Sequence, residues 1–329
     1  MLDKHQEEII KTRANKNLSQ LNICSIDDLN LSDLELIFSL AEKFKKIGNK
    51  KYSLLKDCTI FNAFFESSTR THSSFELAGK KLGADVINIS GNTLEKKKES
   101  LLDISQTLNA LRPEIIVIRT SKSGVPYVLA KHVQAAVINA GDGFHEHPTQ
   151  ALLDFFTIKE YFGADFQKKT ILIVGDIINS RVFGSLVRLA QKYQMKIKIA
   201  APETLLPKDL TKVFQVEVFY DIEKALQNTD IVYTLRVQEE RGTGSLIPTL
   251  REFSKTFGIS EKRFSVTNKN SILMHPGPIM RDIEVHNALI PQKNTLYFKQ
   301  VENGLAIRSA LLWLLGKRSD LIKKEFQYI

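Results

Sequence analysis

The sequence predicts an α/β protein built from two doubly wound parallel sheets joined by a helix. Short apolar segments rich in β-branched residues alternate with longer amphipathic segments, and this alternation runs twice along the chain. A long amphipathic segment over 149–163 separates the two runs. Strands that alternate with helices form parallel sheets covered on both faces. With 329 residues the chain is long enough for two ordinary domains with cores of their own.

The first run begins with a helix over 32–44, where Ser32 and Glu35 have the spacing of a capping box. A helix over 70–83 is expected to end at Gly83. The other elements expected in this run are strands over 59–65, 85–90, 114–119 and 135–140 and helices over 100–111 and 124–133.

The second run predicts a helix over 181–194 and a last helix that starts at Asn303 and packs back on the first domain. Its expected strands cover 169–176, 196–202, 216–221, 230–236 and 271–277. We therefore expect two Rossmann-like domains: residues 18–149 together with 304–329, and residues 150–303.

The charge balance indicates anionic partners. Lys and Arg number 46 and Asp and Glu 37, which gives a formal net charge of +9. Apart from "EKKKES" (95–100) and "FKKIGNKK" (44–51), the basic residues are scattered. Because no nucleic-acid-binding signature occurs either, small anionic substrates are favoured over nucleic acid. The sequence has no apolar run long enough for a membrane span. Its only cysteines, Cys24 and Cys58, form neither a disulfide framework nor a zinc motif, so a cytoplasmic protein is expected.

One stretch, "FFESSTRTHSSFE" at 64–76, places hydroxyl groups and a cation where an apolar strand ends and a helix begins. A helix N-terminus offers unpaired N–H groups and a partial positive charge. Hydroxyls add donors, and an arginine adds a planar, charged fork. Ordinary N-capping would need one Ser or Thr, whereas four hydroxyl residues surround Arg70 at the predicted helix start: Ser67, Ser68, Thr69 and Thr71. An anion site at Ser68, Thr69, Arg70 and Thr71 is therefore favoured.

Other predicted strand ends carry residues of the same kind. Arg119 ends one apolar strand; His145, His147 and Gln150 precede a helix; His275 follows another strand with Pro276 close by. Taken alone, each has an ordinary explanation, such as a strand-end arginine or a histidine satisfied in the core. Histidines two apart in a loop without cysteines make a poor zinc motif. Ligands of such folds bind outside the carboxyl ends of the strands, so the set as a whole favours a site there.

The second run lacks a dinucleotide-binding motif, because Gly175 and Gly184 are too far apart for one and no acidic residue ends the next strand. What recurs instead is arginine: Arg181 at a helix start and Arg236 at a strand end, with Gln238 nearby. Planar bidentate donors suit a carboxylate ligand.

Taken together, these motifs resemble the carbamoyltransferase family, and within it the aspartate branch. The resemblance covers nearly the whole chain, and the S-T-R-T and H-P-T-Q motifs in this order and context are highly specific. The aspartate branch is indicated by "LRVQEER" and "HPGP", since the ornithine branch usually has cysteine where Pro276 stands. The matching stretches are "FFESSTRTHSSFELAGKKLG", "IVIR", "NAGDGFHEHPTQALLDFFTI", "DIVYTLRVQEER" and "MHPGPIMRDIEV".

The resemblance implies a reaction of carbamoyl phosphate with L-aspartate that gives N-carbamoyl-L-aspartate and phosphate, a step of pyrimidine synthesis that needs no metal and no cofactor. It implies that Ser68, Thr69, Arg70, Thr71 and Arg119 bind the phosphate. It gives Thr71, Arg119 and His147 to the carbamoyl oxygen. It gives Gln150 and the carbonyls around Pro276 and Gly277 to the carbamoyl NH2 group. It implies that Arg181, Arg236 and Gln238 bind the two carboxylates of aspartate and that Lys97 also belongs to the aspartate-binding residues.

The resemblance also implies a homotrimer with shared sites, in which Thr93 and Lys97 of "GNTLEKKKES" reach into the neighbouring subunit's site. The family usually has glycine where Lys98 stands, so this sequence departs from the family pattern in the loop. The family often has arginine where His72 stands, and His72 therefore gets no catalytic role. Regulatory or dihydroorotase partners stay open. Two other functions stay open as well: carbamoyl transfer to another amino acid, and an inactive carbamoyltransferase-like scaffold.

Overall fold

The computed structural model describes residues 7–10, 18–48, 50–90, 99–238 and 249–316. The chain divides into two compact units: unit 1 comprises Met1–Phe156 and Val301–Ile329, and unit 2 comprises Thr157–Gln300. The chain passes from one unit to the other within two helices, α7 (Pro148–Phe162) and α13 (Tyr297–Gly316). Each unit holds a parallel sheet with helices on both faces, which confirms the predicted fold class.

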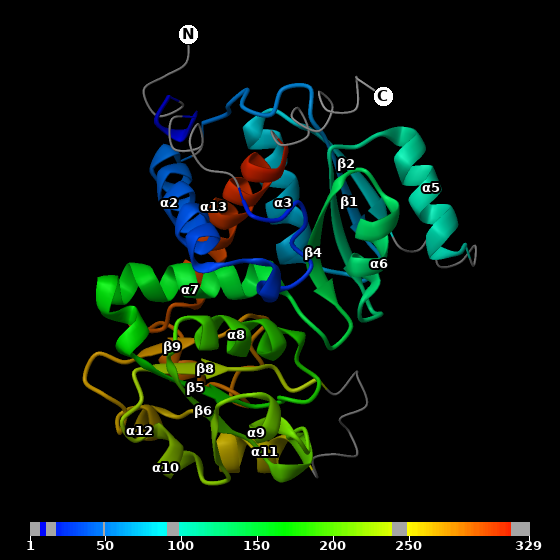
Figure 1. Cartoon of the computed structure of the whole chain (residues 1–329). Coiled ribbons are helices and arrows are strands. Elements are labelled where there is room, and N and C mark those ends of the chain that lie inside the picture. The colour runs from blue at the N-terminus through cyan, green and yellow to red at the C-terminus, as the bar shows by residue number, and fades with distance from the viewer. Residues whose placement is uncertain (1–6, 11–17, 49, 91–98, 239–248, 317–329) are drawn as a thin grey trace. The chain divides into compact units, whose positions relative to one another are not determined.

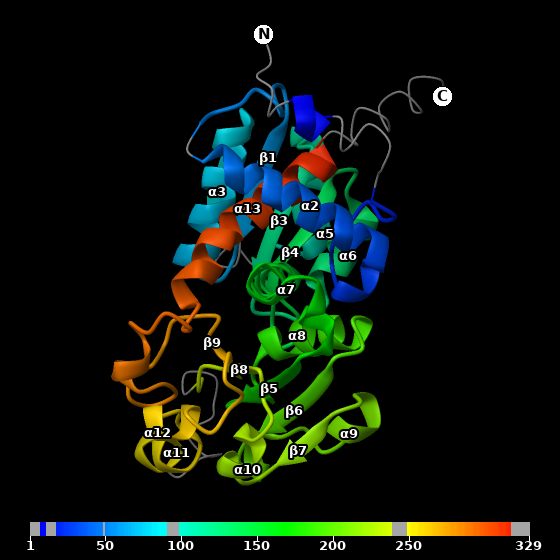
Figure 2. The same cartoon turned by 90° about the vertical axis from the view of Figure 1, so that its left-hand side faces the viewer.

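The sheet of unit 1 has four parallel strands in the order β2-β1-β3-β4. In Figures 1 and 2, α2, α3 and α13 cover one face and α5 and α6 cover the other. Strands covered on both faces need apolar residues on both sides, and β1 and β3 are buried at nearly every position. The elements are α2 (Leu31–Ile47), β1 (Thr59–Phe64), α3 (Thr69–Leu82), β2 (Asp85–Ser90), α5 (Leu101–Leu111), β3 (Ile115–Thr120), α6 (Val125–His132) and β4 (Ala136–Asp142).

Helix α3 ends as the sequence predicts. Gly83 is its C-terminal cap, with a φ of 85° in the left-handed region. A Cβ atom added at Gly83 would lie 2.5 Å from the carbonyl oxygen of Tyr52, so both the backbone angle and the close approach of that segment require glycine.

The predicted capping box of α2 is wrong. Asn30, not Ser32, caps the helix: its side chain accepts from the Asp33 amide at 3.0 Å. The Asp33 carboxylate accepts from the Asn30 amide at 3.0 Å and from the Ser19 hydroxyl at 2.5 Å. The contact with Ser19, 14 residues earlier in the chain, fixes Asp33 and so favours the earlier start.

The sheet of unit 2 has five parallel strands in the order β7-β6-β5-β8-β9. Helix α8 covers one face, and α10, α11 and α12 cover the other (Figures 1 and 2). The elements are β5 (Thr170–Val174), α8 (Arg181–Lys192), β6 (Lys196–Ala200), α9 (Leu210–Val213), β7 (Glu217–Phe219), α10 (Ile222–Leu226), β8 (Ile231–Thr234), α11 (Leu250–Phe257), α12 (Glu261–Phe264) and β9 (Ile272–Met274).

The strand order gives each sheet one switch point. In unit 1 the chain moves outward from β1 to β2 on one side and from β3 to β4 on the other. In unit 2 the same change of direction lies between β5 and β8. Loops on either side of such a point leave a crevice at the carboxyl ends of the strands, which is where ligands bind in this class of fold. None of the helices in the described residues is both long and apolar enough to cross a membrane.

Candidate active site

The hydroxyl-rich stretch after β1 forms the start of α3, as the sequence predicts. Ser68 takes the N-cap position, yet its side chain makes no capping hydrogen bond. Ser68, Thr69 and Arg70 are partly or fully exposed, whereas Thr71 is buried in the first turn. Ordinary side-chain capping therefore does not explain the stretch, and its donors surround a helix N-terminus of the kind that binds anions.

Arg119 lies at the other side of the switch point, near the end of β3. It stands in register with Phe64 of β1, and its main-chain oxygen accepts from the Phe65 amide at 2.8 Å. Its guanidinium lies 3.3 Å from a carboxylate oxygen of Glu66 and 3.4 Å from the carbonyl oxygen of Ala140. The strand ladder and these two contacts hold the cation at the carboxyl end of the sheet, and Glu66 is a neighbour that the sequence prediction missed.

His147 follows β4, the third strand whose carboxyl end contributes to the site, and it contacts the start of α3. Its Nε2 atom lies 3.4 Å from the Thr71 hydroxyl, and the His147 side chain is 4% exposed. Two residues predicted from separate motifs therefore touch in the described structure. Because Thr71 and His147 both carry a hydrogen-bonding atom at this point, the pair can act on one oxygen of a bound ligand.

The turn before His147 is held by a buried carboxylate. Asp142 donates its amide to the Glu146 carbonyl at 3.1 Å and accepts the Glu146 amide at 3.1 Å. Burial raises the pKa of Asp142, but hydrogen bonds from His145, Asn139 and the Gly124 amide lower it by more. The pKa of Asp142 therefore lies below its ordinary value. The turn is thereby fixed by a carboxylate that stays charged at neutral pH.

Glu146 anchors this turn to the N-terminal part of unit 1. Its buried carboxylate accepts from the Ser25 hydroxyl and from the Ile26 amide at 3.0 Å. His145 uses its Nδ1 atom on Asp142 at 3.2 Å, which gives it a structural partner. No group of three or more ligating side chains that could hold a metal ion occurs in the described residues.

Gln150 lies in the first turn of α7, where its amide nitrogen donates to the buried Asp154 carboxylate at 3.0 Å. Gln150 and Asp154 are four residues apart and so share a face of the helix. In unit 1, therefore, the predicted residues Ser68 to Thr71, Arg119, His147 and Gln150 all lie at the carboxyl ends of the adjacent strands β1, β3 and β4.

In unit 2 the predicted residues follow β5, β8 and β9, which are also adjacent. Gln238 donates its main-chain amide to Asp176 at 3.1 Å and its side-chain amide to the carbonyl of Asn179 at 2.9 Å. Asn179 directly precedes the Ser180 cap of α8, where Arg181 is the first helical residue. These contacts join the loop after β8, which carries Arg236, to the loop after β5.

A second buried carboxylate, Glu284, joins the loop after β8 to the loop after β9. It accepts from the Val237 amide at 2.8 Å and the Met280 amide at 2.7 Å, and lies 3.1 Å from His275 Nε2. The Gly277 amide donates to His275 Nδ1 at 2.7 Å, so that ring's proton is on Nε2 and points to Glu284. The segment with Pro276 and Gly277 is thereby tied to the segment with Arg236 and Gln238.

The predicted site residues of unit 1 and those of unit 2 both include arginines, whose positive charge suits anionic ligands. Arg181 is 5% exposed and Arg236 half-buried, and both stand at the switch point of unit 2. Planar guanidinium groups at such a place can hold carboxylates. Thr93 and Lys97, predicted for a loop shared between subunits, lie outside the described residues.

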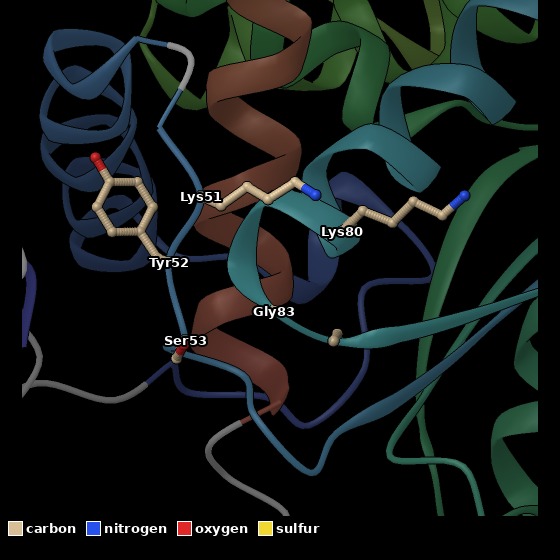
Figure 3. A pocket seen from close by; sticks show the side chains of 6 residues that line it. Lys51, Tyr52, Ser53, Lys80 and Gly83 are labelled. Atoms are coloured by element: carbon tan, nitrogen blue, oxygen red, sulfur yellow. The ribbon is translucent and has the colours of Figure 1, made fainter.

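A hollow of about 400 Å³ in unit 1 lies away from this cluster, at the C-terminal end of α3. Lys51, Tyr52, Ser53, Lys80 and Gly83 line it, as Figure 3 shows. Lys80 is paired with Glu76 at 2.5 Å, and a helix C-terminus carries partial negative charge. The hollow therefore lacks the helix N-terminus and the hydroxyl donors that mark the opposite end of α3.

Comparison with known proteins agrees with this arrangement. The family model "Aspartate/ornithine carbamoyltransferase, carbamoyl-P binding domain" matches residues 21–160, and the corresponding "Asp/Orn binding domain" model matches residues 167–315. The chain is 45% identical to the aspartate carbamoyltransferase catalytic subunit of Cytophaga hutchinsonii, over 91% of this chain and 98% of the relative. It is 43% identical to that of Maricaulis maris, over 92% of this chain and 95% of the relative.

Among solved structures, the chain is similar to aspartate transcarbamoylase from Trypanosoma cruzi in complex with carbamoyl phosphate and aspartate. The TM-score is 0.81 at 28% identity, and the match covers 91% of this chain and 99% of that chain. Both halves of the sequence and the fold thus match one group of enzymes. The chain belongs to the aspartate/ornithine carbamoyltransferase family.

Proposed function

We propose that the chain transfers the carbamoyl group of carbamoyl phosphate to L-aspartate, giving N-carbamoyl-L-aspartate and phosphate in pyrimidine biosynthesis. The observation that carries the proposal is the meeting of the α3 N-terminus with His147, where Thr71 lies 3.4 Å from the histidine ring. Relatives at 43–45% identity are named aspartate carbamoyltransferase, which supports aspartate as the acceptor.

In unit 1 the proposed ligand is carbamoyl phosphate. The phosphate group is bound by the first-turn amides of α3 and by the side chains of Ser68, Thr69, Arg70, Thr71 and Arg119. Thr71, Arg119 and His147 donate to the carbonyl oxygen. The oxygen of the Gln150 amide accepts from the carbamoyl NH2 group.

In unit 2 the proposed ligand is aspartate. Arg181, Arg236 and Gln238 bind its two carboxylates, and the carbonyl oxygens around Pro276 and Gly277 accept from the carbamoyl NH2 group. The network around Asp176 and Glu284 supports this, because it holds these loops at the carboxyl ends of β5, β8 and β9. We assign residues 18–149 with 304–329 to the carbamoyl-phosphate-binding domain and residues 150–303 to the aspartate-binding domain, although three residues of this second range, Gln150, Pro276 and Gly277, serve the carbamoyl NH2 group.

The chemistry needs no nucleophile from the protein. The amine of aspartate attacks the carbonyl carbon, a C–N bond forms, and negative charge grows on the carbonyl oxygen. Donors fixed at that oxygen stabilise the tetrahedral intermediate. The C–O bond to phosphate then breaks, and the departing phosphate takes the amine proton. Holding the two anions together supplies proximity, and the arginines offset their repulsion.

The assignment of the phosphate site is tested by Arg70→Ala. We expect this variant to lose carbamoyl phosphate binding in calorimetry, because it lacks the charged fork beside the helix N-terminus. Lys131→Ala is the matched control, since Lys131 is exposed on α6 and its loss changes the net charge equally. If Arg70→Ala and the unaltered protein bind carbamoyl phosphate equally well, the assignment of the phosphate site to the start of α3 is wrong.

Two alternatives make different predictions. A carbamoyltransferase for another amino acid would form product with ornithine or another amine and not with aspartate. An inactive scaffold would form none, although the retention of Arg119, His147 and Gln150 argues against it. A role with nucleic acid would need a salt-dependent shift of duplex DNA at micromolar protein, and we expect no such shift.

We further propose a cytoplasmic homotrimer with shared active sites, in which Thr93 and Lys97 serve the neighbouring subunit's site. The support is the family to which the chain belongs; a regulatory or dihydroorotase partner is compatible with it. Mixing inactive Lys97→Ala chains with inactive His147→Ala chains should restore part of the activity, because one kind of mixed site contains both intact residues. No recovery after proven subunit exchange would contradict shared sites.

A further inference from the structure

Gln150 has an amide whose two ends are chemically opposite, so its orientation matters. To accept from an NH2 group it must present its oxygen, yet rotation by half a turn would present its nitrogen instead. The proposed function requires the first orientation. What decides between the two must be a neighbour that can only donate or only accept.

Asp154 is such a neighbour. Its carboxylate is fully buried and lies 3.0 Å from the Gln150 amide nitrogen, one helical turn further along α7. An ionised carboxylate accepts hydrogen bonds and cannot donate them. The contact is therefore possible only with the nitrogen of Gln150 on this side. No other described residue makes a hydrogen bond with the Gln150 side chain.

A buried carboxylate needs a compensating charge, and the C-terminal helix supplies one. Arg308 of α13 is 4% exposed; burial lowers its pKa to about 9, and the charge of Asp154 partly offsets this effect. Arg308 thus stays charged at neutral pH and favours the ionised state of Asp154. The guanidinium also lies 5.3 Å from the Phe75 ring centre of α3.

Arg308 links this support to the second helix of the site. It donates to the Ser74 hydroxyl at 2.6 Å, and Ser74 donates to the carbonyl oxygen of Thr71 at 2.9 Å. Thr71 in turn meets His147 at 3.4 Å. Arg308 therefore supports the starts of two helices: α3, which carries Thr71, and α7, which carries Gln150.

We propose that Asp154 is a positioning residue that fixes the Gln150 amide with its oxygen toward the acyl donor, and so selects a donor that carries an NH2 group over one that carries a methyl group. The inference rests on the proposed function of Gln150 as a ligand of carbamoyl phosphate. Carbamoyl phosphate and acetyl phosphate differ only in this group. If the Gln150 amide oxygen is fixed toward the donor, it accepts a hydrogen bond from the NH2 group of carbamoyl phosphate. The same oxygen has no partner when it faces the methyl group of acetyl phosphate.

The test is Asp154→Asn, which keeps the shape but gives Gln150 a partner that can donate as well as accept. We expect carbamoyl phosphate to bind about 10- to 100-fold more weakly. Inorganic phosphate, measured as a competitive inhibitor, should bind within about twofold of the unaltered protein, and acetyl phosphate should bind at least as tightly as it does to the unaltered protein, because the amide oxygen is no longer held unpaired against its methyl group. Glu114→Gln is the matched control, because it changes another buried carboxylate, one bonded to the Thr59 amide at 2.7 Å.

A double-mutant cycle separates positioning from general stability. In a Gln150→Ala background, Asp154→Asn should have no further effect on carbamoyl phosphate binding. Should Asp154→Asn fail to fold because Arg308 is left uncompensated, the neutral pair Asp154→Asn with Arg308→Gln provides the same comparison of the three ligands.

Equal weakening of all three ligands, or an unchanged effect of Asp154→Asn in the Gln150→Ala background, would overturn the proposal. Failure of the proposed function looks different. An unaltered protein that forms no carbamoyl aspartate, but still prefers carbamoyl phosphate to acetyl phosphate in a way that depends on Asp154, would refute the reaction and keep the positioning role.

Discussion

Replacing Glu284 by glutamine should loosen both loops that carry the proposed aspartate site. The carboxylate accepts from three donors: the Val237 amide, the Met280 amide and His275 Nε2. A glutamine has one acceptor oxygen. At best it keeps Met280 and His275 and turns its own NH2 group toward the Val237 amide, so that two donors face each other in a buried place.

The cost follows from these contacts. Burying an unsatisfied donor costs about 1–3 kcal/mol, and the two remaining hydrogen bonds each lose about 0.5–1 kcal/mol when the acceptor becomes neutral. We therefore expect about 2–5 kcal/mol of lost stability and a weaker binding of aspartate. Glu217→Gln is the control, since Glu217 is half-exposed and lies 3.8 Å from Lys196 in a surface pair worth at most about 1 kcal/mol.

The assay is thermal unfolding by circular dichroism together with amide hydrogen exchange of the peptides that contain Val237 and Met280. Glu284→Gln should lower the midpoint by several degrees and speed exchange at both amides, whereas Glu217→Gln should do neither. An unchanged midpoint with exchange at the rates of the unaltered protein would refute the reasoning that Glu284 holds the two loops.

Three further predictions concern other parts of the molecule. His147→Ala should lower kcat about 10²–10³-fold, because it removes a donor to the developing oxyanion; steady-state kinetics with an unchanged fold in circular dichroism would check this, and a loss below about threefold would contradict it. Gly175→Ala should destabilise unit 2 by about 1–3 kcal/mol in urea unfolding, because the φ of Gly175 is 123° and the new Cβ would lie 2.8 Å from the Leu235 carbonyl oxygen. Equal unfolding midpoints of the variant and the unaltered protein would contradict this and show that the Leu235 backbone can move aside. The pKa of Asp142 is lowered in the folded state, so this carboxylate stabilises the fold above its ordinary pKa of 3.8, and the stabilisation is lost as the pH falls through the lowered pKa. Asp142→Asn should therefore lose less stability between pH 5 and about pH 2 than the unaltered protein. Parallel acid-unfolding curves of the two proteins would contradict this.

The sequence predicted the alternation of strands and helices well, because strands covered on both faces are continuous apolar runs. Strand ends were less exact. The strand predicted over 169–176 ends at Val174, and the one predicted over 271–277 covers only Ile272–Met274. In both places the residues beyond the ladder turn away to make the loops of the site, and an apolar pattern carries no signal for that turn.

The candidate site divides in the same way. Arginines and hydroxyls at strand ends stood out in the sequence because they are unusual there, and Thr71 and His147 indeed lie together. The carboxylates that support the site did not stand out. Asp176 and Glu284 look like ordinary surface residues until tertiary structure buries them. The bond between Ser25 and Glu146 joins residues 121 positions apart, which no local pattern contains. For Asp154 a signal existed, since it follows Gln150 at the spacing of one helical turn.

The central claim is that this chain joins carbamoyl phosphate to aspartate. The most direct measurement offers ¹³C-labelled carbamoyl phosphate to the purified protein with equal amounts of L-aspartate and L-ornithine, and follows the carbonyl signals by NMR. The account predicts that N-carbamoyl-L-aspartate appears with one phosphate per product, while no citrulline forms. Citrulline as the main product, or the hydrolysis of carbamoyl phosphate with no carbamoylated amino acid, would contradict it.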